Sequence, residues 1–122
     1  MAMKYEVYVE AYFSSAHRLQ MYKGKCENLH GHNWKVGIVV SSDKLNKDYM
    51  VIDFTKLKKI LKKVISKLDH KYLNKISYFK IKQPTAENIA SYIHANLKKI
   101  LSNCNIKVIV WETPSQYASY EE

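Results

Sequence analysis

Two histidines separated by one glycine are the clearest chemical signal in this sequence. His30 and His32 begin a strand-like run, and in a β-strand residues i and i+2 point to the same face. His17 ends the preceding alternating segment and shares the parity of its apolar residues. If neither strand bulges near its end, the three imidazoles leave the sheet on its buried face. Three neutral histidines with no fourth protein ligand predict a catalytic Zn²⁺ site with an open position.

The alternative is a histidine pair that binds no metal and is an ordinary surface or core feature. The parity of His17 and the nearby thiol of Cys26 favour the metal site. Cys26 precedes the His30–His32 pair by a few residues, so its thiol can lie near the cation without binding it. A nearby cation lowers the pKa of a thiol, which can then act as a base at neutral pH.

Two more polar groups are candidate site residues. Asp69-His70 directly follows an apolar helical stripe, and the aspartate can fix the imidazole tautomer if the two side chains meet. The alternative is a helix-end pair without a catalytic role. Glu112 continues the apolar parity of a strand, where a carboxylate is costly unless it is paired or bound to a ligand. Its alternative is a strand-end residue that reaches water.

Alternation of apolar and polar residues predicts the strands that position these groups, at residues 4–13, 32–41, 106–113 and 116–120. The element order is β-β-α-α-β-β. Hairpins at both ends of this order predict an α+β fold, with a four-stranded antiparallel sheet and two helices on one face.

Two helices are predicted between the pairs of strands. Asp53 is the expected N-cap of the first helix, and Thr85 is that of the second, with Glu87 near the positive end of the helix dipole. The second helix is expected to bury Ile89, Ala90, Ile93, Leu97, Ile100 and Leu101. His94 lies off this stripe and is expected at the surface. A short loop is expected between the two helices.

Length and composition limit the class of protein. The chain of 122 residues is long enough for one domain, residues 1–122, and too short for two. It shows no signal peptide and no run long enough to span a bilayer. Two cysteines predict a reducing, cytoplasmic environment, with Cys104 as a small buried or half-buried side chain.

The net charge of +9 comes almost entirely from lysine, and Arg18 is the sole arginine. Base-reading proteins favour arginine clustered with aromatic residues, so nucleic acid is not the expected partner. A basic amphipathic helix can lie on an anionic membrane, but in a globular chain with so much other core a membrane is not expected either. A solvated helix face, with a secondary role in attracting a polyphosphate substrate, accounts better for the lysines. That face contains Lys56, Lys58, Lys59, Lys62, Lys63 and Lys67.

Six motifs in order along the chain resemble the 6-pyruvoyl-tetrahydropterin synthase / 6-carboxy-tetrahydropterin synthase family. They are Ser15-Ala16-His17-Arg18-Leu19, Cys26-x-x-x-His30-Gly31-His32, Val51-Ile52-Asp53-Phe54, Leu68-Asp69-His70-x-x-Leu73-Asn74, Pro84-Thr85-Ala86-Glu87-Asn88 and Glu112-Thr113. The resemblance implies the tunnelling fold, in which this unit assembles into a homo-oligomeric barrel. The assembly is usually a hexamer with active sites between subunits.

The resemblance also implies roles for individual residues. His17, His30 and His32 would bind zinc, and Cys26, Asp69 and His70 would form an acid/base relay. Glu112 would hold the guanidine-like edge of a pterin through two parallel hydrogen bonds, and Thr85 is a further substrate-binding candidate. The implied substrate is 7,8-dihydroneopterin triphosphate, from which triphosphate is eliminated. Lys23 or Lys25 could face the triphosphate.

The spacing between Cys26 and His30 resembles the branch that makes 6-carboxy-5,6,7,8-tetrahydropterin, with release of acetaldehyde, for queuosine-type deazapurines. The pyruvoyl branch has a longer insert. Glu27 matches a further branch that forms 6-hydroxymethyl-7,8-dihydropterin for folate synthesis, and members with both residues resemble a dual type. The alternative for Glu27 is a solvent-exposed loop residue. The alternatives for the whole protein are a zinc-binding protein without turnover and a basic nucleic-acid-binding domain.

Overall fold

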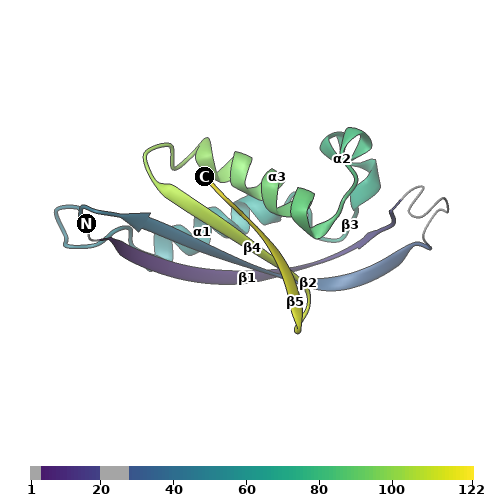
Figure 1. Cartoon of the computed structure of the whole chain (residues 1–122), viewed down its shortest axis with the longest axis horizontal. Coiled ribbons are helices and arrows are strands. Elements are labelled where there is room, and N and C mark those ends of the chain that lie inside the picture. Colours follow the sequence, from purple (N-terminus) through teal and green to yellow (C-terminus); the bar gives the residue numbers. More distant parts are fainter. Residues whose placement is uncertain (1–3, 20–27) are drawn as a thin grey trace.

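A β-sheet with helices on one face forms the framework of the chain (Figure 1). The structure, a computed structural model, describes residues 4–19 and 28–122. Within these residues the sheet has five strands in the order β3-β1-β2-β4-β5. The strands are β1 (Tyr5–His17), β2 (His30–Ser42), β3 (Lys71–Tyr72), β4 (Asn105–Thr113) and β5 (Gln116–Glu121).

The longest elements are β1 and β2, which form an antiparallel pair without a register shift from Tyr5↔Ser42 to His17↔His30. Buried and more exposed positions alternate along β1, as the sequence predicts, because only one face of the sheet is covered. Both strands are longer than expected at the end that carries the histidines. The register pairs His17 with His30 and Ser15 with His32. It confirms the parity that placed the three histidines on one face.

The helix α1 (Phe54–Ile65) begins where the sequence predicts, with the carboxylate of Asp53 accepting a 3.1 Å hydrogen bond from the backbone nitrogen of Lys56. Its buried side chains are Leu57, Leu61, Val64 and Ile65. All six lysines of the predicted solvated face are exposed. The apolar stripe therefore covers the sheet, and the charged side chains stay in water.

The helix α3 (Ala86–Lys98) packs against β4 and β5, and Thr85 caps its first turn by accepting a bond from the backbone nitrogen of Asn88. Two details of the predicted stripe are wrong. His94 is only 3 % exposed, because β5 covers it: the ring packs on Tyr120 and bonds the carbonyl of Glu122. Ile100 is exposed, since the helix ends before it.

The segment between α1 and α3 also differs from the prediction of a short loop. It contains β3, a 3₁₀ turn η1 (Leu73–Lys75) and a short helix α2 (Ser77–Ile81). The strand β3 runs parallel to β1 and pairs with Ser15 and Ala16, so the predicted four-stranded antiparallel sheet becomes a mixed sheet of five strands within the described residues. A strand of two residues is too short to produce a readable alternation.

The core lies between the covered face of the sheet and the helices. Its fully buried side chains include Trp34, Ile38, Leu61, Ile93 and Val108. Cys104 is half-buried, as expected. Among the helices of residues 4–19 and 28–122, none combines the length and apolarity needed to cross a membrane.

The cap at the start of α1 makes a quantitative prediction. Replacing Asp53 by alanine leaves a backbone N–H of the first turn without its carboxylate partner and should lower the free energy of unfolding by about 1 kcal/mol. Urea denaturation monitored by circular dichroism measures this change. Asp43→Ala removes an exposed carboxylate outside the helix and should change stability by less than about 0.5 kcal/mol. Equal effects of the two substitutions would contradict the capping role.

Candidate metal centre

Three imidazoles meet at the end of the β1–β2 hairpin. His17 and His30 are direct cross-strand partners, and His32 pairs with Ser15. One ring nitrogen of each histidine lies within 4.8 Å of the others. His17 is only 2 % exposed, while His30 and His32 are partly buried. The hairpin alone therefore brings together the three residues that the sequence predicted as metal ligands.

Backbone carbonyls fix the tautomer of two of these rings. The Nδ1–H group of His17 donates to the carbonyl of Pro84 at 2.7 Å, and that of His30 donates to the carbonyl of Asn28 at 2.9 Å. A carbonyl oxygen only accepts hydrogen bonds, so both Nδ1 atoms carry the proton. In the neutral rings, each Nε2 then presents a lone pair. A hydrogen bond from the other ring nitrogen to a carbonyl is the contact that commonly orients metal-binding histidines.

The two Nε2 atoms face each other at 3.0 Å. Two lone pairs at this distance repel each other unless a positive charge lies between them, as a shared proton or a metal ion. Ligand nitrogens about 2.0–2.1 Å from a tetrahedral zinc ion lie about 3.3 Å apart. The separation between His17 and His30 is close to that value, and the donor set consists of imidazole nitrogens, which suit zinc. The histidines present therefore fit the expected ion.

Trp34 forms the floor below the cluster. It is fully buried, and its ring centroid lies 5.0 Å from that of His17 and 5.1 Å from that of His32, both in edge-on contacts. Its indole nitrogen donates a 3.3 Å hydrogen bond to the carbonyl of Ser15. The rings of His17 and His32 thus pack against a rigid side chain, which restricts their orientations.

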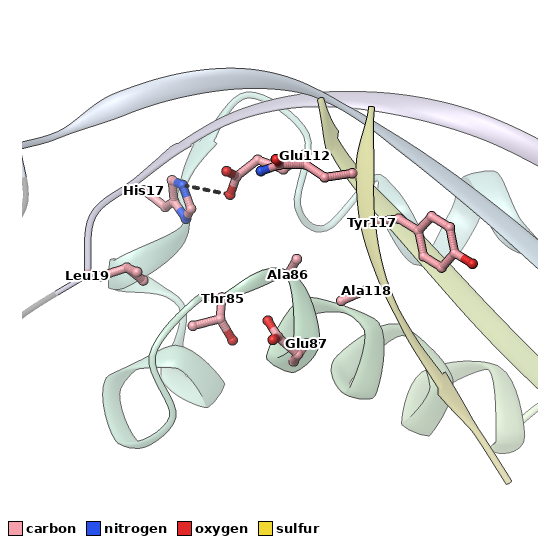
Figure 2. A pocket seen from close by; sticks show the side chains of 9 residues that line it. His17, Leu19, Thr85, Ala86, Glu87, Glu112, Tyr117 and Ala118 are labelled. Atoms are coloured by element: carbon pink, nitrogen blue, oxygen red, sulfur yellow. Dashed lines mark ion pairs between the residues drawn. The ribbon is translucent and has the colours of Figure 1, made fainter. Parts of the chain in front are cut away.

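Glu112 lies beside the histidines, on the face predicted by its parity. Its carboxylate oxygens are 3.7 Å from Nε2 of His17 and 3.9 Å from Nε2 of His32. The side chain is 27 % exposed and lines a cavity of about 430 Å³, in which it faces His17 (Figure 2). The carboxylate therefore lies beside the histidines and is only partly exposed to water.

The opposite wall of the cavity comes from the start of α3. Thr85, Ala86 and Glu87 line it, and the side chains of Thr85 and Glu87 extend from the first turn of the helix (Figure 2). Thr85 therefore lies where a substrate-binding residue would, while its hydroxyl also caps the helix. Glu87 was predicted only to interact with the helix dipole, and its place in the cavity was missed.

The third wall was also missed. Gln116, Tyr117 and Ala118 of β5 line the cavity, although the ring of Tyr117 points away from it (Figure 2). The register of β5 on β4 shifts between Trp111 and Thr113. Such a bulge changes which side chains face the cavity, so alternation alone could not find this wall.

Asp69 and His70 do meet, as predicted, because the carboxylate Oδ2 lies 3.0 Å from Nδ1 of the imidazole. The ring is 82 % exposed, and the backbone of His70 has a positive φ of 56°. His70 lines a second hollow of about 540 Å³, together with His32. The histidine cluster therefore contacts two hollows among the described residues: Glu112 lies in one and His70 in the other.

Hydrogen bonding sets the charge of Asp69. The backbone nitrogen of Ser14 donates to its Oδ1 at 2.9 Å, and this bond, followed by the attraction of His70, lowers the pKa of the carboxyl below its ordinary value. The carboxylate is thus anionic at neutral pH and accepts the Nδ1–H of His70. That arrangement leaves Nε2 of His70 available to take up or release a proton.

Cys26, predicted as a base, and Glu27, predicted as a catalytic candidate of the hydroxymethyl-forming branch, lie outside the described residues. Lys23 and Lys25, the predicted contacts of a triphosphate, also lie outside them. Their positions and roles remain predictions.

Comparison with known proteins fits this geometry. The family model described as 6-pyruvoyl tetrahydropterin synthase matches residues 6–122. The chain belongs to the 6-pyruvoyl tetrahydropterin synthase family. A solved structure of Caenorhabditis elegans 6-pyruvoyl tetrahydropterin synthase superposes with a TM-score of 0.84 and 32 % identity, covering 98 % of this chain and 96 % of that one. The α+β fold predicted from the sequence is therefore that of the family.

Curated relatives in the synthase family have more than one name. The 6-carboxy-5,6,7,8-tetrahydropterin synthase of Haemophilus influenzae is 34 % identical, over 97 % of this chain and 99 % of its own length. The dihydroneopterin monophosphate aldolase of Pyrococcus furiosus is 39 % identical over 81 % of this chain and 80 % of its own length. Relatives of this chain therefore bear the names of more than one pterin activity.

The contacts of Asp69 predict its titration. Its carboxyl carbon should titrate by NMR with a pKa below 3.8. A depressed pKa means that Asp69 stabilises the fold above the pKa of the unfolded chain, and that this contribution is lost as the pH falls through the folded pKa. In His70→Ala the pKa should stay below 3.8, because the bond from Ser14 is the larger cause. A carboxyl in the intact protein that titrates at or above 3.8 would refute this account.

Proposed function

We propose that the chain is a zinc-dependent 6-carboxy-5,6,7,8-tetrahydropterin synthase. It acts on 7,8-dihydroneopterin triphosphate, eliminates triphosphate and releases acetaldehyde. The observation that carries the proposal is the cluster of three histidines beside a cavity lined by Glu112. In this cluster the Nε2 atoms of His17 and His30 face each other at 3.0 Å. Family membership supports tetrahydropterin synthase-type chemistry, and the H. influenzae relative bears the name of this activity.

In this proposal His17, His30 and His32 would hold the zinc ion, and three protein ligands would leave it able to bind substrate as well. A bound zinc ion would polarise the hydroxyl groups of the substrate side chain and make the adjoining C–H bonds more acidic. Pro84 and Asn28 keep the two Nδ1 atoms protonated through their carbonyls, so the Nε2 atoms stay available as ligands.

Glu112 would bind the pterin ring. A carboxylate accepts two parallel hydrogen bonds from a guanidine-like edge, and the carboxylate of Glu112 lies next to the histidines in the cavity. Because its oxygens are 3.7 and 3.9 Å from His17 and His32, a ring anchored there would place its side chain beside the metal ligands. Thr85, on the opposite wall, would add a hydroxyl contact.

Asp69 and His70 would move protons, with the carboxylate fixing the ring. His70 lines the second hollow rather than the cavity of Glu112, and Asp69 lines neither of the two. Cys26 would act as the base near the metal. We further propose that the chain, as one tunnelling-fold domain of residues 1–122, forms a homo-oligomeric barrel. A hexamer with sites between subunits would let neighbouring copies complete each site.

The second candidate is cleavage to 6-hydroxymethyl-7,8-dihydropterin through Glu27, alone or in a dual-activity enzyme. The adjacent Cys26 and Glu27 favour it, and so does the name of the P. furiosus relative, an aldolase acting on dihydroneopterin monophosphate. The two candidates lead to different cytoplasmic pathways. The carboxy product leads to queuosine-type deazapurines, and the hydroxymethyl product leads to folate.

Product analysis tests the proposal. Zinc-loaded protein incubated with 7,8-dihydroneopterin triphosphate should yield 6-carboxy-tetrahydropterin, identified by mass spectrometry, together with acetaldehyde. Removing the metal with a chelator should abolish turnover, and adding zinc should restore it. Formation of 6-hydroxymethyl-dihydropterin would favour the second candidate. If the zinc-loaded protein, with its thiols reduced, leaves the substrate unchanged, the proposal is wrong and the protein is a zinc-binding protein without turnover.

Separate substitutions distinguish the roles of the adjacent residues 26 and 27. Cys26→Ala should lower formation of the carboxy product by about 100-fold or more, as expected on loss of a general base. Glu27→Ala should lower only the hydroxymethyl product. Quantifying both products for each variant, with zinc content as the control for an intact site, makes the comparison. If Glu27→Ala changes neither product, Glu27 has no catalytic role.

A further inference from the structure

Hydrogen bonds from segment 68–74 hold the end of β1 that carries His17. The carboxylate of Asp69 and the backbone nitrogen of His70 bond the two backbone polar groups of Ser14, the latter at 2.6 Å. The hydroxyl of Ser15 donates to the carbonyl of Leu68, and β3 then pairs with Ser15 and Ala16. This pairing ends one residue before the metal ligand.

Asn74, which follows β3, extends this set of hydrogen bonds to Arg18. Its side-chain oxygen accepts a 2.9 Å hydrogen bond from the backbone nitrogen of Arg18, and its side-chain nitrogen donates a 2.8 Å bond to the carbonyl of the same residue. The amide thus satisfies both backbone groups of Arg18, as a neighbouring strand would. All four groups are partly buried, where an unmade hydrogen bond is costly.

We propose that Asn74 is a positioning residue that fixes the backbone on the far side of His17. With Ser15 held before it and Arg18 after it, the backbone of His17 is anchored on both sides. Its ring then keeps Nδ1 on the carbonyl of Pro84 and Nε2 3.0 Å from that of His30. Without the amide of Asn74, the hydrogen bonds from segment 68–74 to this part of the chain would reach no further than Ala16.

The same segment carries Asp69 and His70, so one stretch of chain positions a metal ligand and the proposed proton-transfer pair. His70 holds its positive φ while its backbone nitrogen bonds Ser14. A non-glycine residue in this region is under strain that its surroundings must hold. Asn74 holds the other end of the same segment through its two hydrogen bonds to Arg18. The inference rests on the proposed metal function for its consequence and on hydrogen bonds within the chain for its mechanism.

The test compares Asn74→Ala with Asn74→Asp and with a matched control. Asn96→Ala also removes a side-chain amide that donates to a backbone carbonyl, that of Tyr92 at 2.9 Å, but in the last turns of α3. The measurements are the zinc dissociation constant by competition with a chromophoric chelator, the absorption spectrum of the Co²⁺-loaded protein, and hydrogen exchange of the Arg18 amide.

Asn74→Ala should raise the zinc dissociation constant by about tenfold, the effect typical of removing a residue that supports a metal ligand. It should also shift the cobalt spectrum, and the Arg18 amide should exchange at least about tenfold faster because its acceptor is gone. Asn74→Asp keeps the acceptor and loses the donor, so it should fall between the intact protein and Asn74→Ala. It also preserves the test if the alanine variant does not fold.

Unchanged zinc affinity and cobalt spectrum in Asn74→Ala would overturn the proposal, as would an equal loss of affinity in Asn96→Ala. Should the intact protein take up neither zinc nor cobalt, the proposed function fails. Exchange of the Arg18 amide then decides the inference by itself: acceleration confined to the Asn74 variants supports the positioning role, and unchanged exchange refutes it.

Discussion

The unbroken antiparallel register of β1 and β2 is the constraint on which the site depends. From Tyr5↔Ser42 to His17↔His30, every cross-strand partner follows in order. A slip of one residue would send the imidazole of His17 to the other face of the sheet. The buried face of the hairpin packs on the apolar core, so the same hydrophobic pattern that holds the strands together also orients the three imidazoles.

Charge distribution around the cluster follows from this placement. Three imidazoles and the carboxylate of Glu112 lie within a few ångströms of one another, and two Nε2 lone pairs face each other. This arrangement attracts a cation, and the carboxylate strengthens the attraction because a negative charge stabilises a nearby positive one. The lysines of α1 lie on the opposite, solvent-facing side of their helix, which keeps positive charge away from the core.

The segment between α1 and α3 adds a second kind of control. It packs along the end of β1 with side-chain and backbone hydrogen bonds rather than with a long strand, through Asp69, the backbone of His70 and the amide of Asn74. Such bonds fix position more precisely than apolar contacts do, because they are directional. The hairpin thus decides which residues meet, and this segment decides how firmly the end of the strand is held.

The sequence by itself determined the long strands, the starts of α1 and α3, and the common face of His17, His30 and Glu112. Periodicity and capping are local, so they can be read without knowing what packs where. Only the tertiary structure decided that Pro84 orients His17, that β5 buries His94 and that Asn74 holds Arg18. These contacts join residues 28 to 67 positions apart in the chain, and their partners are set by the packing of whole elements rather than by any local pattern.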